Sequence, residues 1–315
     1  MTLLEGLEKK LRQELPELEL RKNEPMSKHT SFKVGGPAAL MALPKMGEAK
    51  AVMEAAFRCN VVPFFLGNGS NLLVSDNGYD GFVVKLSENY SGGELYAVDG
   101  KPYPSGLLVR GSMSLSRAAN LALEYELTGL EWAAGIPGTV GGAITMNAGA
   151  YGGEIAQVLY DVQTIRLDGS FDLIPNRECE FAYRHSAFSD GQHLILYATF
   201  LVEPGDPAAI KARMDDLAAQ RKAKQPLEYP SAGSTFKRPP AVNGQPVYAA
   251  ALIDQCGCKG LTVGGAQVSE KHAGFIINRG GATCADILAL VEEVRRRVYD
   301  QTGITLELEV KTLGV

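Results

Sequence analysis

The feature that most constrains this chain is a glycine-rich segment near its middle. Glycine loses more conformational freedom on folding than any other residue, so a dense run of glycines needs a structural reason. Close approach of the backbone to a flat, bulky ligand is one reason, and a cluster of tight turns is the alternative. The length of the run favours the ligand. Small and apolar residues separate the seven glycines, which are Gly135, Gly138, Gly141, Gly142, Gly149, Gly152 and Gly153.

A second glycine loop, GNGSN at 67–71, follows an apolar run at 61–66. Leu72 stands where the dinucleotide fingerprint has its third glycine, and the residues that follow favour a strand over a helix. The loop also lacks the lysine of a P-loop. Its successive backbone N–H groups could still bind an anion, although a simple turn explains the pattern equally well. Together the two loops could clamp the diphosphate and ring of one extended dinucleotide.

Composition excludes several classes of function. The 315 residues are enough for two or three domains, and the net charge of -5 argues against a nucleic-acid partner. No apolar run approaches the roughly 18–20 residues of a membrane span. The first twenty residues are acidic and lack the apolar centre of a signal peptide. We therefore expect a cytoplasmic protein that binds neither nucleic acid nor membrane.

The cysteines indicate reduced thiols. Their number is odd and no secretion signal precedes them, which argues against a disulfide framework. Cys256 and Cys258 form a close pair, but no second pair or nearby histidine completes a metal site. We expect no metal. The five are Cys59, Cys179, Cys256, Cys258 and Cys284.

Periodicity and turn signals predict helices and strands in irregular order, which is typical of an α+β fold. Residues 88–106 are rich in Gly, Ser, Tyr and Pro and are expected to form a loop. The sequence Asp168–Gly169 predicts a hairpin turn within 158–174. Helices are expected near 3–15, 47–58, 114–128, 207–224, 247–255 and 285–299, and further strands near 61–66, 72–86, 193–202 and 304–310.

Three polar positions could carry chemistry, and each has a plain alternative. Arg184 in FAYRHS lies among residues that favour a strand or its end, and it could be a surface arginine. Ser234 in SAGSTF could be an ordinary turn serine, and Glu309 an exposed strand glutamate. His272 and Lys224 have equally plain alternatives. Sequence spacing alone cannot bring these positions together.

Taken together, the motifs resemble one family, the UDP-N-acetylenolpyruvoylglucosamine reductases, also called UDP-N-acetylmuramate dehydrogenases. The resemblance runs from about Thr30 to Val310 and fits the shorter of the family's two types. Each motif is weak alone, and the combination is specific. The stretches that carry it are TSFKVGGPA, GNGSNLLVSDNG, GLEWAAGIPGTVGGAITMNAGAYGGE, FAYRHS, KQP, SAGSTFKRP, GGAQVS and GITLELEV.

The resemblance implies a two-part FAD-binding region of the vanillyl-alcohol-oxidase (PCMH-type) kind and a smaller α+β domain for substrate. It also implies FAD that is tightly but non-covalently bound. The implied domains are 1–86 and 87–212 for FAD, 213–303 for substrate, and 304–315 as a final strand that carries Glu309. The residues expected to hold FAD are Gly67, Asn68, Gly69, Ser70, Asn71, Gly135, Ile136, Pro137, Gly138, Thr139, Gly141, Gly142, Ile144, Asn147, Ala148 and Gly149.

The family's chemistry follows as an expectation. NADPH reduces the flavin and leaves, and the enolpyruvyl ether of UDP-N-acetylglucosamine then enters the same cleft. Hydride passes from flavin N5 to C3 of the enolpyruvyl group, so that carbanionic, enolate-like character develops at C2. A proton completes UDP-N-acetylmuramate, a peptidoglycan precursor. A monomer is expected, with NADPH and the sugar nucleotide as its only partners.

The resemblance also assigns roles to individual residues. Ser234 aligns with the proton donor, while Arg184 and Glu309 align with the groups that polarise the substrate carboxylate and stabilise the enolate. Two positions depart from the family pattern: Arg238 stands where asparagine is usual, and Lys311 where arginine is usual. The expected substrate-binding residues are Lys224, Arg238 and His272.

Two other functions fit a flavin scaffold. One is a flavin oxidase that uses oxygen and another substrate. The other is a non-catalytic module that senses a nucleotide. The motifs SAGSTF and LELEV favour the reductase, because a general flavin scaffold does not require them.

Overall fold

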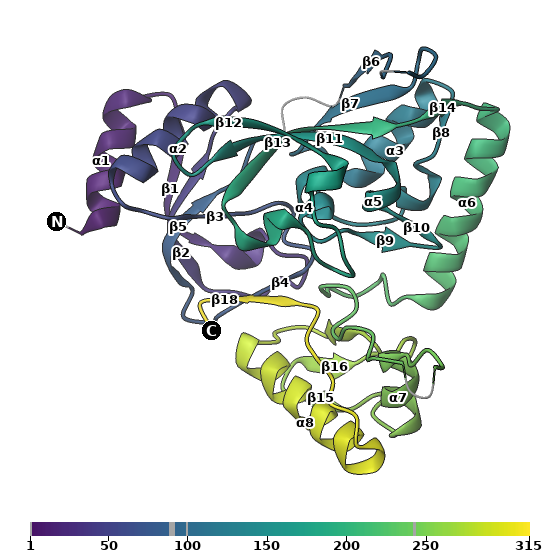
Figure 1. The fold of residues 1–315 in the computed structure, drawn as a ribbon. Coiled ribbons are helices and arrows are strands. Elements are labelled where there is room, and N and C mark those ends of the chain that lie inside the picture. The colour runs from purple at the N-terminus through teal and green to yellow at the C-terminus, as the bar shows by residue number, and fades with distance from the viewer. Residues whose placement is uncertain (1, 88–91, 99, 242–243) are drawn as a thin grey trace. The chain divides into compact units, whose positions relative to one another are not determined.

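The chain combines helices with mostly antiparallel strands, which confirms the α+β prediction (Figure 1). The computed structural model describes residues 2–87, 92–98, 100–241 and 244–315. These residues form two compact units, each assembled from three stretches of chain. Unit 1 comprises Met1–Lys22, Leu40–Asn68 and Gly81–Gln220, and unit 2 comprises Asn23–Ala39, Gly69–Asp80 and Arg221–Val315. The domains that we predict are defined by what they bind, so their boundaries stay a prediction.

The helices form close to where the sequence predicts them. Thr2, Ser114 and Thr283 each cap a helix by accepting a backbone N–H from the first turn. Asp206 and Pro207 begin the long helix that ends at Lys224, as expected. The helices are α1 (Leu3–Glu14), α2 (Ala49–Arg58), α3 (Leu115–Glu124), α4 (Val140–Thr145), α5 (Ile155–Val158), α6 (Pro207–Lys224), α7 (Ala249–Gln255) and α8 (Cys284–Thr302).

The strands include the predicted hairpin at Gly169, which joins β11 to β12. In chain order they are β1 (Glu19–Pro25), β2 (Pro37–Leu43), β3 (Pro63–Phe65), β4 (Leu72–Val74), β5 (Tyr79–Val84), β6 (Glu94–Tyr96), β7 (Gly106–Arg110), β8 (Leu127–Thr128), β9 (Gly149–Ala150), β10 (Gly153–Glu154), β11 (Leu159–Arg166), β12 (Phe171–Pro175), β13 (His193–Leu201), β14 (Glu203–Pro204), β15 (Thr262–Val263), β16 (Ala266–Val268), β17 (Ile276–Asn278) and β18 (Lys311–Leu313).

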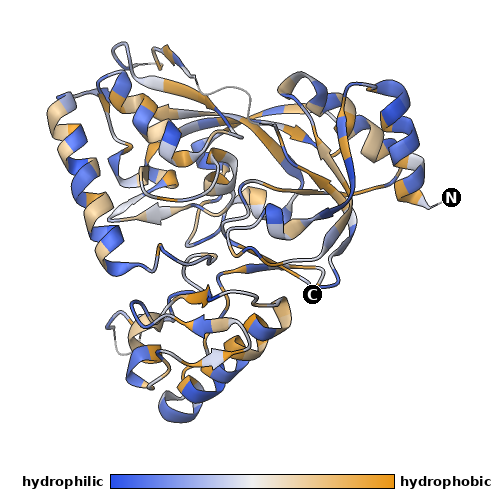
Figure 2. Ribbon diagram, turned by 180° about the vertical axis from the view of Figure 1, so that it is seen from behind, coloured by the Kyte–Doolittle hydropathy of each residue, from blue (hydrophilic) through white to orange (hydrophobic). Residues whose placement is uncertain are grey.

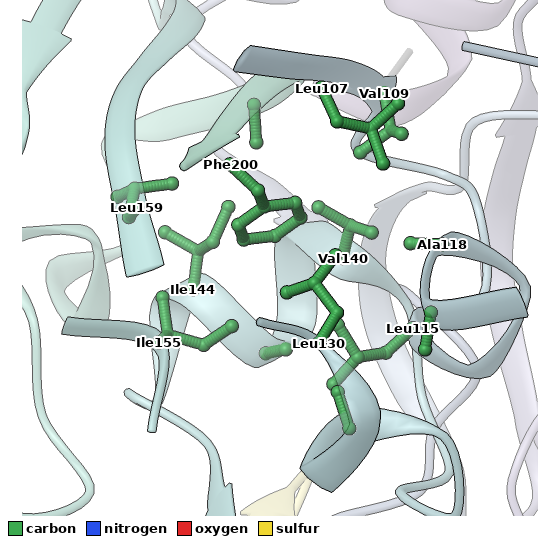
Figure 3. Packing of buried hydrophobic residues seen from close by; sticks show 14 of the residues in the cluster. Leu107, Val109, Leu115, Ala118, Leu130, Val140, Ile144, Ile155, Leu159 and Phe200 are labelled. Carbon is green, nitrogen blue, oxygen red and sulfur yellow. The ribbon is translucent and has the colours of Figure 1, made fainter. Parts of the chain in front are cut away.

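The main core of unit 1 lies on one face of an antiparallel sheet with the strand order β12-β11-β13-β7-β6. Phe200 is fully buried at its centre, among Leu107 of β7, Leu159 of β11 and Val140 and Ile144 of α4 (Figure 3). A buried phenylalanine of this kind contributes about 3–5 kcal/mol relative to alanine. Because α4 belongs to the glycine-rich segment, this core fixes that segment against the sheet.

A second core in unit 1 forms around α1 and α2. Leu7 and Leu11 of α1 and Val52 of α2 are fully buried together with Phe82 of β5. Leu7 and Leu11 are four residues apart, so both lie on the face of α1 that packs into this core. The strands of this region follow the order β1-β2-β5-β3.

Unit 2 is built on α8 and the antiparallel sheet β15-β16-β17. The apolar face of α8 is buried, and Figure 2 shows the hydrophilic residues of this helix on its other side. β18 pairs in parallel with β4, with Lys311 opposite Leu72. This pairing joins the end of the chain to the residues that follow the GNGSN loop.

Two predicted elements are shorter than expected. α3 ends at Glu124 rather than near residue 128, because Glu126 adopts φ 58° and breaks the helix before β8. The strand predicted at 304–310 is absent from the described residues, and only Leu308 forms an isolated bridge there, with Phe236. Leu306 and Val310 are buried and Leu308 is half-buried, so the side chains alternate, but none of the described strands pairs along the whole segment.

The predicted loop at 88–106 contains a strand. β6 pairs antiparallel with β7, which begins at Gly106, the last residue of the predicted loop. Turn-forming residues around β6 conceal this strand in the sequence. Residues 88–91 and 99 of the predicted loop lie outside the described part of the chain.

Candidate active site

The two glycine loops meet within unit 1. A Cβ atom added at Gly67 would lie 2.5 Å from the Oγ1 atom of Thr139. Thr139 itself caps α4 by accepting a hydrogen bond from the N–H of Gly142 at 3.1 Å. The start of the GNGSN loop and the start of α4 are thus in direct contact, as a clamp made from both loops requires.

The second glycine of the GNGSN loop shows why the loop needs this residue type. Gly69 adopts φ 57°, and a Cβ atom there would collide with the carbonyl oxygen of His29. Its own carbonyl accepts a hydrogen bond from the N–H of Ser31 at 3.1 Å. A left-handed residue after a bend turns successive N–H groups to one side, and such a concavity suits a diphosphate. Binding of the FAD phosphates by this loop stays a prediction.

The glycine-rich segment does not offer the first N–H groups of α4 to a ligand, although its composition suggests close approach of the backbone to one. The first N–H groups of α4 are already used within unit 1: Val140 donates to the carbonyl of Met113 at 2.8 Å, and Gly141 to that of Gly111 at 2.8 Å. These donors are therefore occupied by protein. The exposed residues of the segment are Gly135, Pro137, Gly142, Tyr151 and Gly152.

Part of the glycine density serves close packing within the protein, a reason that differs from both a ligand and a cluster of tight turns. A Cβ atom at Gly153 would collide with the indole ring of Trp132, and one at Gly141 would lie 3.2 Å from the Gly111 carbonyl. Ile144 is fully buried in the core (Figure 3), and Ala148 is also buried. The contacts of Gly138, Ile136 and the rest of the expected set with FAD stay a prediction.

Asn147 anchors the turn that carries Arg184. Its side chain is 2% exposed, donates from Nδ2 to the carbonyl of Ala182 at 3.1 Å, and accepts the N–H of Ala156 at 3.0 Å. Ala182 and His185 exchange two backbone hydrogen bonds, which place Tyr183 and Arg184 at the tip of a tight turn. The sequence favoured a strand or its end at this position, and the turn instead results from anchoring to the glycine-rich segment.

Arg184 is held in an uncommon backbone conformation, with φ 55°. A residue other than glycine in this region costs roughly 1–3 kcal/mol, and it persists only when its surroundings impose it. Its guanidinium lies 5.1 Å from the centre of the Tyr183 ring, which is half exposed. The turn therefore holds the Arg184 backbone in one conformation, and the residue is half-buried.

Ser234 and Glu309 lie on two segments of unit 2 that pair with each other. The N–H of Glu309 donates to the carbonyl of Thr235 at 2.9 Å, and Lys237 donates to Glu307 at 2.9 Å. Residues about 75 positions apart are thus brought together, which no spacing in the sequence indicates. Ser234 is exposed and Glu309 is half-buried.

The residue after Ser234 fixes its loop. Thr235 is 1% exposed, donates its N–H to the carbonyl of Gly274 at 2.8 Å, and accepts the N–H of Ile276 on its hydroxyl at 3.0 Å. A hydroxyl on a rigid loop can deliver a proton without a large loss of side-chain entropy. The sequence SAGST shows small residues but does not show which of them is anchored.

The expected substrate-binding residues occupy three separate segments of unit 2. Lys224 is exposed at the end of α6, and the Arg238 guanidinium lies 5.1 Å from the centre of the exposed Tyr248 ring. His272 accepts the N–H of Gly274 on Nδ1 at 3.2 Å. Burial lowers the pKa of His272, so the ring is neutral at pH 7 and carries its proton on Nε2.

Sequence reasoning missed Ser31, which links two of these loops within unit 2. Its hydroxyl donates to the carbonyl of Ser231 at 2.6 Å and lies 3.3 Å from the carbonyl of Gly69. The only sequence signal for this role is the small polar pair that begins the motif TSFKVGGPA. Arg184 belongs to unit 1, whereas Ser234 and Glu309 belong to unit 2.

The cysteines are thiols in this structure. Burial raises the pKa of Cys179 to about 12 and that of Cys284 to about 11, so both stay protonated at neutral pH. Cys256 and Cys258 are buried beside α8. In the described part of the chain, no group of three or more His, Cys, Asp or Glu side chains is arranged to hold a metal ion.

Among the described residues, none of the helices has the length and apolar character needed to cross a membrane.

Comparison with known proteins places these features in a family. The model for an FAD binding domain matches residues 37–171, and the model for the C-terminal domain of UDP-N-acetylenolpyruvoylglucosamine reductase matches residues 225–313. The first match contains both glycine loops. The second contains Ser234, Arg238, His272 and Glu309.

Relatives match over nearly the whole chain. A UDP-N-acetylenolpyruvoylglucosamine reductase from Caldanaerobacter subterraneus subsp. tengcongensis is 45% identical over 99% of both chains. One from Clostridium novyi is 46% identical over 98% of this chain and 96% of its own. The crystal structure of the reductase from Thermus caldophilus has a TM-score of 0.76 at 34% identity, covering 94% of this chain and 99% of that one. With an FAD-binding domain, the family's C-terminal domain and relatives that match over nearly its whole length, the chain belongs to the UDP-N-acetylenolpyruvoylglucosamine reductase family.

Proposed function

We propose that the protein catalyses the NADPH-dependent reduction of UDP-N-acetylenolpyruvoylglucosamine to UDP-N-acetylmuramate. Bound FAD would supply the hydride transfer, from NADPH to the enolpyruvyl double bond. The observation that carries the proposal is the backbone pairing of the Thr235 and Glu309 segments, since it sets a hydroxyl and a carboxyl group on adjacent, fixed stretches of unit 2.

In this proposal Ser234 gives the proton that completes the product. Serine is a weak acid in water, but a carbon centre with carbanionic character is a strong base, so the transfer is favourable when the geometry is right. The exposed hydroxyl of Ser234 is accessible to a ligand, and anchored Thr235 limits its motion. The serine can act only in the half-reaction that consumes the enolpyruvyl substrate.

Arg184 and Glu309 would act on the substrate carboxylate. Negative charge develops beside this carboxylate as hydride arrives at C3, and a preorganised guanidinium stabilises it without reorganisation. The strained turn at Arg184 gives that fixed orientation. Glu309 would have to carry a proton in order to donate a hydrogen bond to the same carboxylate from its paired segment. Each side chain therefore contributes most when charge has developed.

The sugar nucleotide and NADPH both carry a diphosphate, and exposed cations of unit 2 suit it. Lys224 and Arg238 are the proposed partners, with neutral His272 as a hydrogen-bond partner.

We place FAD binding in residues 1–86 and 87–212, and substrate binding in 213–303. Use of NADPH in peptidoglycan precursor synthesis is consistent with a cytoplasmic location, and we propose a monomer, which sedimentation would test.

The first test separates the two half-reactions by following flavin absorbance after rapid mixing under anaerobic conditions. Ser234→Ala should slow reoxidation by the enolpyruvyl sugar nucleotide by roughly 10²–10⁴, the range for a positioned acid. Reduction by NADPH should change little, because no carbanion forms in that step. The exposed turn serine gives a matched control, Ser170→Ala, which should leave both rates unchanged.

An equal loss in both half-reactions of Ser234→Ala would contradict its role as proton donor. Wild-type protein that is reoxidised by oxygen but not by the sugar nucleotide would instead indicate a flavin oxidase.

A further inference from the structure

We propose that Asn71 is a positioning residue for Glu309, and that its side chain aligns the carboxyl group rather than binding the cofactor. The inference rests on the proposed function, because it takes Glu309 as a group that contacts substrate. It changes the role expected for the last residue of the GNGSN loop. All the contacts that support it lie within unit 2.

Asn71 forms two hydrogen bonds with the segment that carries Glu309. Its side-chain Nδ2 donates to the carbonyl of Glu309 at 3.1 Å. Its backbone carbonyl accepts the N–H of Lys311 at 3.1 Å. The two bonds enclose Val310, whose side chain is buried in the core of unit 2. Asn71 therefore fixes the peptide planes on both sides of Val310.

The other peptide group of Glu309 is fixed from the opposite side. Its N–H donates to the carbonyl of Thr235, the residue that follows Ser234. Both backbone polar groups of Glu309 are thus used, one by the serine-bearing loop and the other by Asn71. Loss of the Asn71 donor would let the peptide plane of the Glu309 carbonyl rotate, which would shift the Cα and Cβ atoms of Glu309. A displacement of about 1 Å at a reacting group can cost roughly 10²-fold in rate.

The same loop thereby serves two purposes. Gly67 and Gly69 give it the close approach and the bend that suit a diphosphate, whereas Asn71 lies at its end, immediately before β4. Parallel pairing of β4 with β18 continues the contact along Leu72 and Lys311. The end of the GNGSN loop and the segment that carries Glu309 are therefore fixed relative to each other.

The test uses Asn71→Asp, which keeps the shape of the side chain and removes the Nδ2 donor, and Asn71→Ala. Asn77→Asp makes the same chemical change at an exposed residue of the next turn and is the matched control. In both Asn71 variants, reoxidation by the enolpyruvyl sugar nucleotide should slow about 10–100-fold. Reduction by NADPH should stay within about twofold, and FAD affinity within about threefold, of wild type.

Amide hydrogen exchange in the cofactor-free protein gives a readout that is independent of activity. Both Asn71 variants should lose about 3–10-fold of the protection at residues 309–311, the loss expected for one hydrogen bond. A pH series separates them further. As pH falls toward the carboxyl pKa of the new aspartate, its protonated form regains a donor, so reoxidation by Asn71→Asp should recover relative to Asn71→Ala at the same pH.

Three outcomes would overturn the inference. One is a loss of FAD affinity with equal slowing of both half-reactions, which would make Asn71 a cofactor contact. Another is unchanged protection at 309–311, and a third is unchanged reoxidation. If wild-type protein is not reoxidised by the sugar nucleotide at all, the proposed function fails. The exchange experiment then still decides whether Asn71 fixes the Glu309 segment.

Discussion

At the scale of single residues, His272 shows how local contacts set a protonation state. Nδ1 accepts the N–H of Gly274, and the ring packs edge-on against Phe275 with 4.9 Å between the ring centres. Burial lowers its pKa from the ordinary 6.5, and the positive charge of Lys259 acts in the same direction. Protonation would remove the acceptor at Nδ1 and would place a positive charge in apolar surroundings. The folded protein therefore prefers neutral His272.

This preference predicts a pH-dependent contribution to stability. The folded-state pKa lies below the unfolded value, so the unfolded chain binds the proton more readily, and stability decreases as pH falls from about 6.5 through the folded pKa. Urea unfolding between pH 7.5 and 5 should show a shallower decline for His272→Gln than for wild type. Exposed His185→Gln is the control, with the wild-type slope expected. Parallel curves for wild type and His272→Gln would refute the assignment.

At the scale of elements, α8 depends on a carboxylate from a distant part of the sequence. Asp76, in the turn after β4, accepts the N–H of Cys284 at 2.7 Å and that of Ala285 at 3.0 Å. Thr283 and Asp286 cap the same end by a capping box. The positive end of the helix dipole favours this concentration of acceptors. The first turn of α8 is thereby attached to the loop region of β4.

The cap predicts a measurable loss of stability. Asp76→Ala should lower the free energy of unfolding by about 1–2 kcal/mol, because two N–H groups of α8 lose their acceptor. Asp76→Asn, which keeps one oxygen, should lose less. Asp80→Ala, four residues further on at an exposed position, should change the free energy by less than about 0.5 kcal/mol. Chemical denaturation measures all three, and equal effects of Asp76→Ala and Asp80→Ala would show that the cap contributes nothing.

At the scale of the whole molecule, the two units are interleaved in the chain. Unit 2 takes residues 23–39 and 69–80 from the first third of the sequence and the rest from the last third. Phe32 and Val34 belong to its core, and Asn278 donates from Nδ2 to the carbonyl of Phe32 at 3.0 Å. β18 has β4 as its partner. The C-terminal part of the sequence therefore lacks essential pieces of its own fold.

Interleaving predicts that residues 221–315 do not fold alone, although they include the matched C-terminal domain. The isolated segment lacks the partner strand of β18, the Asp76 cap and part of the core, and the burial that remains should not offset its conformational entropy. Its amide NMR spectrum should be poorly dispersed, and its circular dichroism should change without a cooperative thermal transition. The full chain is the control and should unfold cooperatively. A folded, cooperative segment would contradict the prediction.

The sequence by itself determined the elements whose signals are local. Helix periodicity and caps predicted α1, α6 and α8, and Asp168–Gly169 predicted the β11–β12 turn, because neighbouring residues decide these structures. Motif combinations also identified the family and its FAD-binding fold, since each motif encodes its own backbone geometry. Strands that depend on a distant partner were predicted less well: β6 was missed, and the strand predicted at 304–310 does not form in the described residues.

Only the tertiary structure decided how the candidate site is assembled. Pairing of Glu309 with Thr235, the anchor of Arg184 on Asn147 and the contact of Gly67 with Thr139 join residues that lie far apart in the sequence. Long-range contacts such as these depend on how separate elements pack. The entropic cost of closing the intervening loop changes only slowly with its length, so the spacing of two segments in the sequence does not reveal whether they meet. The sequence could thus name the reactive side chains, while packing of distant segments determined which atoms hold them in place.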